Sequence, residues 1–333
     1  MREIGSEFWD VPVCNVDTEL FPKSTNWFLS GRSALQAIIS DLKDCHSVSM
    51  PSWCCDSMIK PFVDAGMDVH FYPVYFDRGL VQEIRLDADA LFLMDFFGYT
   101  SDVINLDEYN GIIIRDVTHS IFSASYSDAD YYFGSLRKWC GVWTGGYAWN
   151  KYGHKLPTEK SDGGRRYISL RKAAMQQKAE YISGLKIDKA YLKVFDDAEE
   201  ALEYIGVVSA CERDIDLARK LDVDFIKNQR RTNATILREE LHDMLAFDKM
   251  EEIDTPMFVP ILVSDGKRDA LRRYLINNGI YCPVHWPLSE YHKLDEKEIS
   301  IYKNELSLVC DQRYTEEDMY RMVDAIKQFW KEA

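Results

Sequence analysis

The first half of the chain alternates between segments with helical and with strand-like apolar periodicity, and this alternation strongly constrains its fold. After Ser30 and Gly31, apolar residues recur at helical spacing over 34–42, and a second helix is expected over about 55–65. Short apolar runs typical of strands end at Met50-Pro51 and cover 68–74, 89–94, 111–116, 130–134 and 145–149. This pattern predicts an α/β fold in which helices cover a mostly parallel sheet.

The second half of the chain predicts a separate, smaller unit. A polar stretch over 151–170, which includes Arg165 and Arg166, is expected to be a loop, and helical patterns follow over 170–183, 196–219 and 221–245. From Pro256 onward the sequence predicts a strand over 257–263, a helix over 266–277, a strand over 280–285 and a final helix after Thr315. We therefore expect a large domain over 1–245 and a small α/β domain over 246–333.

Charge and composition exclude several classes of protein. The 333 residues carry a net charge of −15, which argues against nucleic acid or an anionic membrane as the main partner. No stretch approaches the ~20 apolar residues of a membrane span, and the first ten residues lack the apolar core of a signal peptide, so a cytoplasmic location is expected. The eight cysteines show no CxxC spacing, which favours free thiols and argues against a metal site.

Two of the predicted strands end in reactive side chains. The run Ile112-Ile113-Ile114 leads to Asp116 and His119, and the next strand leads to Ser135 and Lys138. In parallel sheets, ligands gather at the carboxyl ends of the strands. An amine, a carboxylate and hydroxyl donors are the groups that pyridoxal phosphate requires: the amine for its aldehyde, the acid for its ring nitrogen and the donors for its phosphate. A third element fits, because Ser33 lies at the start of the first long helix, where free amides attract anions.

Each of these residues also has an ordinary structural explanation. Most lysines in loops are solvated and chemically idle, although Trp139 and Cys140 beside Lys138 favour partial desolvation. Asp116 could cap the turn that follows its strand, and His119 could be a buried histidine that bonds to the backbone. Their combination in one chain is the argument for a cofactor site.

The chain resembles the fold-type-I pyridoxal-phosphate enzymes, and more narrowly the DegT-type aminotransferases, many of which act on nucleotide-linked keto sugars. The resemblance covers nearly the whole chain. Its most specific part is the pair Asp116 and Lys138, 22 residues apart in that order. It also rests on the segments 31–35, 50–66, 116–120, 135–138, 145–146, 279–287 and 311–314.

The resemblance implies a role for each site residue. Lys138 is expected to bind the cofactor as a Schiff base and to move a proton between cofactor and substrate. Asp116 is expected to pair with the pyridine nitrogen and His119 to lie near the phenolic oxygen. Ser33, the amide of Ala34 and Ser135 are expected to hold the phosphate. The resemblance also implies a homodimer with active sites at the subunit interface.

Two features depart from the family pattern. Where the family has an aromatic residue that stacks on the cofactor ring, this chain has Cys55, with Trp53 two residues earlier, so either the thiol or the indole faces the ring. The serine that precedes the lysine by five residues in the sugar enzymes is here Ser135, three residues before Lys138. Both departures concern the sugar substrate more than the cofactor.

These observations predict an aminotransferase that moves an amino group from glutamate or glutamine to a keto group, with a nucleotide-linked keto sugar as the expected acceptor. Elimination, aldol cleavage and sulfur transfer are alternatives within the same cofactor chemistry, and a non-catalytic regulatory protein that binds the cofactor is a further one. In the small domain, His285, Trp286 and Arg313 are the candidates for substrate contacts. Arg313 could grip a donor carboxylate or could pair with an acid of the protein.

Overall fold

The computed structural model describes residues 3–77, 79–100, 106, 108–123, 128–159 and 162–332, the side chain of Asp162 excepted. Two compact units make up the chain, and each consists of several segments. Unit 1 comprises Met1–Ser6, Cys45–Ala129 and Asp224–Ala333, and unit 2 comprises Glu7–Asp44 and Asp130–Val223. The division of the chain into domains 1–245 and 246–333 stays a prediction.

Unit 1 contains the parallel strands that the alternating pattern predicts. Their order is β8-β7-β3-β4, with the bounds β3 (Ser47–Pro51), β4 (Asp68–Tyr72), β7 (Ala90–Met94) and β8 (Ile112–Asp116). Every residue of β7 is buried, as expected for a strand that is covered on both faces. The helix α2 (Asp56–Asp64) links β3 to β4, and Asp116 ends β8 beside Met94 of β7. The alternation therefore predicts this part of the fold correctly.

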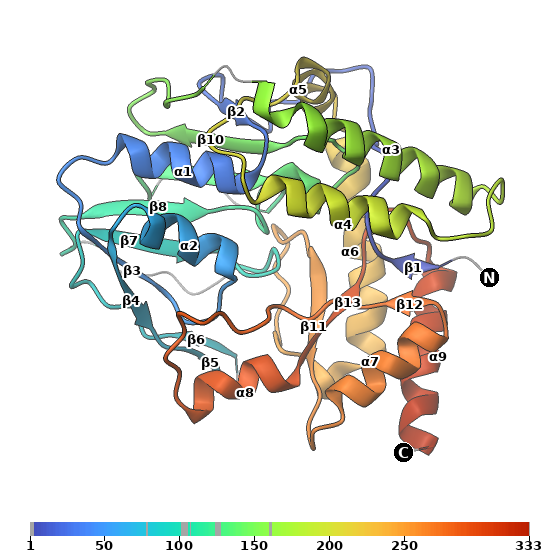
Figure 1. Cartoon of the computed structure of the whole chain (residues 1–333). Helices are drawn as coiled ribbons and strands as arrows, with labels where there is room; N and C mark the ends of the chain where they lie inside the picture. Colours follow the sequence, from blue (N-terminus) through green and yellow to red (C-terminus); the bar gives the residue numbers. More distant parts are fainter. Residues whose placement is uncertain are drawn as a thin grey trace. The chain divides into compact units, whose positions relative to one another are not determined.

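The rest of unit 1 consists of short strand pairs and helices (Figure 1), many of which contribute residues to an apolar core. Its strand pairs are β1 (Ile4–Gly5) with β12 (Ile280–Tyr281), β11 (Phe258–Leu262) with β13 (Glu305–Val309), and β5 (Val74–Phe76) with β6 (Leu80–Gln82). Its helical segments are α6 (Val223–Glu240), η3 (His242–Met244), α7 (Arg268–Asn277), α8 (Glu296–Asn304) and α9 (Glu316–Glu332). The final helix expected after Thr315 is confirmed as α9, and Met319, Met322 and Ile326, which recur at helical spacing, are fully buried. α8 and β13 were not predicted from the sequence, although Asp295 and Glu298 form a capping box at the start of α8.

Unit 2 contains three strands that pair antiparallel, a detail that the expected mostly parallel sheet did not specify. They lie in the order β2-β10-β9, with the bounds β2 (Asn26–Phe28), β9 (Tyr131–Ser135) and β10 (Gly146–Asn150). The connection between β9 and β10 contains only the 3₁₀ turn η1 (Leu136–Lys138) and a short loop. A parallel crossover requires about a dozen residues or more, usually with a helix, so this connection favours an antiparallel pair.

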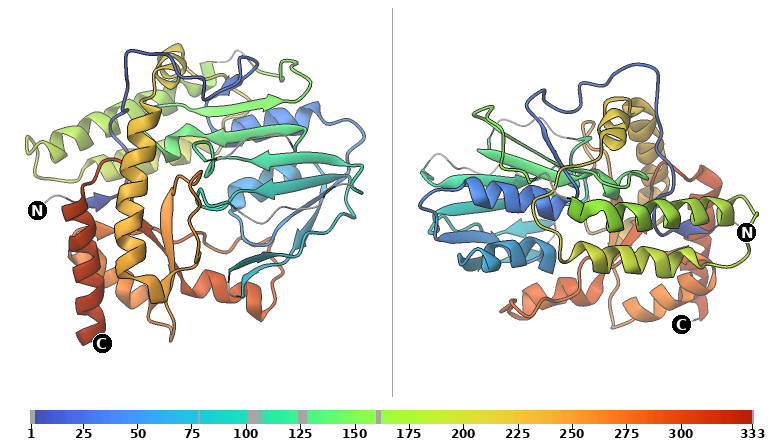
Figure 2. Two further views of the ribbon diagram at one scale, coloured as in Figure 1. Left: turned by 180° about the vertical axis from the view of Figure 1, so that it is seen from behind. Right: turned by 45° about the horizontal axis from the view of Figure 1, so that its top comes forward.

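The helices of unit 2 begin and end at places that the sequence predicts only in part. They are α1 (Gly31–Asp41), η2 (Asp162–Gly164), α3 (Arg165–Ile182), α4 (Tyr191–Leu202) and α5 (Glu212–Arg219). The expectation of a loop through residue 170 is wrong, because α3 already begins at Arg165; Lys160 and Ser161 lie outside the described residues. The single helix expected over 196–219 is two helices, divided by the turn that contains Gly206. Figure 2 shows α3 and α4 side by side.

Candidate active site

Lys138 ends η1, directly after β9 in unit 2. The turn is anchored by buried neighbours, because Leu136, Trp139 and Cys140 are each at most 1% exposed. The amide of Leu136 donates to the carbonyl of Gly145, and the amide of Trp139 donates to that of Leu136. Lys138 itself is exposed, so the expected partial desolvation of its amine is not present in this structure. The fold fixes the backbone of this lysine and leaves its amine accessible.

Ser135 carries a buried hydroxyl beside the start of α1. Its Oγ has no hydrogen-bond partner among the described residues, although Ser135 is only 7% exposed. A Cβ added to Gly31, the first residue of α1, would lie 3.2 Å from the Cβ of Ser135. Buried hydroxyls are almost always paired, so an unpaired one beside a helix N-terminus indicates a place for a ligand with acceptor atoms.

The two other predicted phosphate contacts are engaged within unit 2. Ser33 donates from Oγ to the carbonyl of Gly206 at 2.9 Å, and its amide donates to the Oγ of Ser30, the N-cap of α1. The amide of Ala34 donates to the carbonyl of Ser30 at 3.0 Å, as in any helix. The amides that a helix leaves without internal partners are those at its very start, here Gly31 and Arg32. Ser33 and Ala34 therefore shape this end of the helix.

A charged cluster that no sequence pattern predicted includes Arg137, the residue before Lys138. Arg137 donates from Nη1 to Glu199 at 2.7 Å and to the hydroxyl of Tyr167 at 2.6 Å. Arg171, which is 1% exposed, donates to Glu7 at 3.0 Å. Partial burial alone would raise the pKa of Glu199, but Arg137 and Arg171, with a smaller effect from Lys138, lower it to about 2. These acids are charged at neutral pH. The residues come from four separate segments, so no local pattern could have joined them.

Asp116 and His119 are buried in unit 1, just after β8. The Oδ1 of Asp116 accepts a hydrogen bond of 2.8 Å from the amide of Thr118, as a turn-capping aspartate does. The Nδ1 of His119 accepts one of 3.1 Å from the amide of Phe97. A nitrogen that accepts carries no proton, so the neutral ring of His119 holds its proton on Nε2 and presents a donor there. Both residues therefore have a structural role, because each accepts a hydrogen bond from a backbone amide. Both also lie at or just after the carboxyl end of β8, where a ligand could bind.

His285 and Trp286 lie close to His119 in unit 1. The ring centroids of His119 are 6.0 Å from those of His285 and 5.9 Å from those of Trp286, which is stacked on it at an interplanar angle of 22°. The indole of Trp53 adds to this group, because its Nε1 donates to the carbonyl of His285 at 2.7 Å. The structure thus brings together three residues that the sequence proposes separately, His119, His285 and Trp286.

The structure separates Cys55 from Trp53 by exposure. Trp53 is 0% exposed and stacks on Phe96 with ring centroids 5.0 Å apart. Cys55 precedes α2, is partly exposed, and its Sγ lies 2.9 Å from the Oγ of Ser57. Trp53 is a core residue in this structure, so of the two candidates for the cofactor ring Cys55 is the accessible one.

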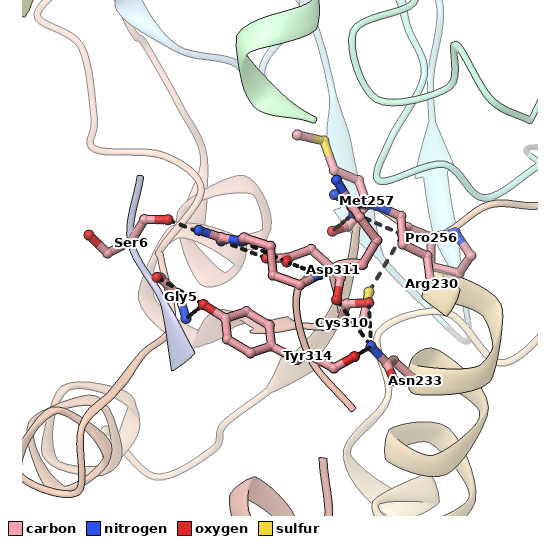
Figure 3. Close-up of polar contacts among 11 residues, drawn as sticks. Gly5, Ser6, Arg230, Asn233, Pro256, Met257, Cys310, Asp311 and Tyr314 are labelled. Carbon is pink, nitrogen blue, oxygen red and sulfur yellow. Dashed lines mark hydrogen bonds and ion pairs between the residues drawn. The ribbon is translucent and has the colours of Figure 1, made fainter. Parts of the chain in front are cut away.

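Arg313 is occupied by an acid of its own segment. Its Nε and Nη2 donate to the two carboxylate oxygens of Asp311 at 2.8 and 2.7 Å, and Nη2 also donates to the carbonyl of Ser6 at 3.1 Å. Although burial would raise the pKa of Asp311, the charge of Arg313 lowers it, so the pair is ionic. Figure 3 shows Asp311 and Ser6 in this network, which also includes Tyr314. Arg313 therefore pairs with an acid of the protein, which is one of the two alternatives given above for this residue. The Nε–Nη2 edge of its guanidinium group is occupied by Asp311 and is not available to a substrate carboxylate.

No three His, Cys, Asp or Glu side chains in the described ranges gather so as to hold a metal ion. No described helix is both long enough and apolar enough to cross a membrane.

Solved structures of sugar aminotransferases are similar to this chain, whereas no protein-family model and no curated sequence matches it. A DegT DnrJ EryC1 StrS aminotransferase from Brucella abortus is 15% identical, with 92% of this chain and 85% of that one covered and a TM-score of 0.61. PseC of Helicobacter pylori, an aminotransferase involved in the biosynthesis of pseudoaminic acid, is 14% identical over 98% of this chain and 100% of that one, with a TM-score of 0.61. A Streptococcus pneumoniae protein described as a sugar aminotransferase, in its PLP form, is 13% identical over 91% and 86% of the two chains, again with a TM-score of 0.61.

These likenesses confirm the predicted fold class and the resemblance to the DegT-type aminotransferases. At such low identity they concern the fold alone. The chemistry must be argued from the side chains described above.

Proposed function

We propose that this chain is a pyridoxal-phosphate-dependent aminotransferase in which Lys138 binds the cofactor. The observation that carries the proposal is the buried hydroxyl of Ser135, which has no partner among the described residues and lies beside the start of α1, three residues before the exposed Lys138. When bound, pyridoxal phosphate supplies an electron sink that stabilises negative charge on the substrate carbon.

The residues of unit 2 fit the phosphate and the aldehyde of this cofactor. The hydroxyl of Ser135 would donate to a phosphate oxygen, and the first amides of α1 would add donors and the positive end of the helix dipole. Gly31 keeps this space open, since a side chain there would press on Ser135. The amine of Lys138 can reach a carbonyl because it is exposed, and it would hold or release the proton that moves during amino transfer.

The residues of unit 1 fit the ring of the cofactor chemically. A protonated pyridine nitrogen is a suitable cationic partner for a buried carboxylate such as that of Asp116. The Nε2–H of His119 is a suitable donor for a phenolic oxygen. The assignment of both residues to the cofactor that Lys138 binds rests on their order in the sequence and remains a prediction.

The amino donor, the acceptor and the assembly are finer parts of the same proposal. Glutamate or glutamine is proposed as the donor and a nucleotide-linked keto sugar as the acceptor, with support from the sugar aminotransferases among the similar structures. A homodimer with active sites at the subunit interface stays a prediction from the family resemblance, as does a cytoplasmic location.

The test is the visible spectrum of the purified protein supplied with pyridoxal phosphate, before and after borohydride. We expect an absorption band in the wild type, covalent attachment of the cofactor to the peptide that contains Lys138 after reduction, and complete loss of both in Lys138→Ala. Lys155→Ala, which removes another exposed lysine of unit 2, is the matched control and should behave as the wild type. Attachment that survives in Lys138→Ala would refute the assignment.

Addition of amino donors then distinguishes amino transfer from the other pyridoxal-phosphate reactions. Glutamate or glutamine should convert the bound cofactor to its amine form, with release of the corresponding keto acid. A protein that binds the cofactor covalently but converts with no amino donor would instead be one of the other pyridoxal-phosphate enzymes or a regulatory protein.

A further inference from the structure

A buried carboxyl, a hydroxyl and an imidazole form a chain of hydrogen bonds in unit 1. Glu305 and Ser307 lie two residues apart on β13, so their side chains share one face of the strand. The hydroxyl of Ser307 donates to Oε1 of Glu305 and lies 2.8 Å from the Nδ1 of His285. The amide of His285 donates to Oε2 of the same carboxyl group at 2.8 Å. Glu305 and Ser307 are 0% exposed.

Three further titratable groups among the described residues bear on these hydrogen bonds. Arg268, at the start of α7, donates to the backbone carbonyl of Glu305 at 3.0 Å, and its charge favours the carboxylate. Burial raises the pKa of the Cys282 thiol to about 12, so this neighbour of Glu305 is neutral. The ring of His119 lies 6.0 Å from that of His285. Burial outweighs the bonds from Ser307 and His285 and raises the pKa of Glu305 to about 8.

The hydroxyl of Ser307 has a single proton. The group that receives this proton fixes the donor and the acceptor of each hydrogen bond from Glu305 through Ser307 to His285. When Glu305 is ionised, Ser307 donates to it and must accept from His285, which then carries its proton on Nδ1 and none on Nε2. When Glu305 is protonated, it donates to Ser307, which in turn donates to Nδ1, so the proton of His285 lies on Nε2. The protonation of Glu305 and the tautomer of His285 are therefore coupled through Ser307.

We infer that Glu305, Ser307 and His285 form a proton relay. A proton is taken up at the Nε2 of His285, the Nδ1–H proton passes to the oxygen of Ser307, and the hydroxyl proton of Ser307 passes to Glu305. One N–H bond forms and one breaks, Glu305 becomes neutral, and the imidazole remains neutral throughout. The reverse sequence returns the proton at Nε2. Glu305 and Ser307 are thus positioning residues that set whether His285 accepts or donates at Nε2.

The relay exists independently of any cofactor, and only its use during amino transfer rests on the proposed function. The test is ¹⁵N NMR of histidine-labelled protein, without added cofactor, between pH 6 and 10. We expect the His285 signals to change from the Nε2–H to the Nδ1–H tautomer as pH rises through about 8, the pKa of Glu305. Infrared spectra should show the band of a protonated carboxyl group disappear over the same range. His285→Gln identifies the His285 signals.

Three variants separate a relay from simple packing. Glu305→Gln should remove the carboxyl band and abolish the tautomer change. Ser307→Ala should uncouple His285 from Glu305, and Ser307→Thr, which keeps the hydroxyl, should restore the coupling. Ser49→Ala replaces another buried serine of unit 1 and should leave the change intact. A single His285 tautomer from pH 6 to 10 in the wild type would overturn the inference, as would an unchanged transition in Glu305→Gln or Ser307→Ala. The wild-type spectra decide the question even where a variant fails to fold.

Discussion

The candidate residues of unit 1 are buried and bonded, whereas those of unit 2 combine accessible and unpaired groups. Asp116, His119 and His285 each have a backbone or side-chain partner inside unit 1. In unit 2, Lys138 is exposed and Ser135 has no partner among the described residues. A hydrogen-bonded group needs no ligand to account for its position. A buried hydroxyl without a partner, in contrast, carries a free-energy cost that a ligand can remove. The case for a ligand is therefore strongest in unit 2, and unit 1 contributes side chains with fixed orientation.

The largest effect that would test this contrast is the removal of the central aromatic ring of unit 1. Trp53→Ala should lower the free energy of unfolding by about 3–5 kcal/mol, because it opens a cavity among Phe96, Phe97 and Trp286. Trp143→Ala in unit 2 is the matched control and should cost less, since Trp143 is only partly buried. Urea denaturation measures both. Equal losses would mean that the rings of unit 1 are no more tightly packed than that of Trp143.

The two units should also respond to pH in opposite directions. Glu305 in unit 1 has its pKa raised by burial from an ordinary 4.5 to about 8, so the folded protein binds more protons than the unfolded chain between these values. The free energy of unfolding should then fall as pH rises from 4.5 to 8, by at most about 1.4 kcal/mol per pH unit from this group. Glu305→Gln should flatten that decline.

For Glu199 in unit 2 the sign is reversed. Its pKa is lowered to about 2, because Arg137 and Arg171 outweigh the effect of burial, so its stabilisation is present above pH 4.5 and is lost as pH falls toward 2. The loss should be modest, since half of the Glu199 side chain is exposed to solvent. Glu199→Gln should reduce the acid sensitivity without changing the behaviour between pH 5 and 8. Thermal unfolding at a series of pH values measures both variants, and a shared pH response would contradict the assignment of these shifts to separate units.

The sequence predicts best where local patterns determine the structure. The strand that ends at Asp116 and the buried stripe of α9 follow from periodicity alone. The antiparallel pairing of β9 and β10 depends on the short connection after Ser135, which the strand pattern does not encode. Networks such as Arg137 with Glu199 or His285 with Ser307 join residues far apart in the sequence, so only the folded chain identifies them. The spacing of two residues predicts that the side chains of Glu305 and Ser307 share one face of a strand. It does not predict that they contact His285.

The smallest expected effect is that of two serine substitutions in unit 2, which distinguish a side chain that contacts a ligand from one that only stabilises the fold. Ser135→Ala removes a buried hydroxyl without a partner, so the cofactor-free protein should be as stable as the wild type or slightly more stable. Its affinity for pyridoxal phosphate should fall about tenfold, the equivalent of one hydrogen bond to a charged phosphate. Ser33→Ala should show the opposite pattern, a loss of about 1 kcal/mol of stability, because Ser33 donates to the carbonyl of Gly206. Thermal unfolding of the cofactor-free proteins and cofactor titration give the two quantities. If Ser135→Ala lost stability and kept its affinity, Ser135 would be a structural residue and the phosphate would have to bind elsewhere.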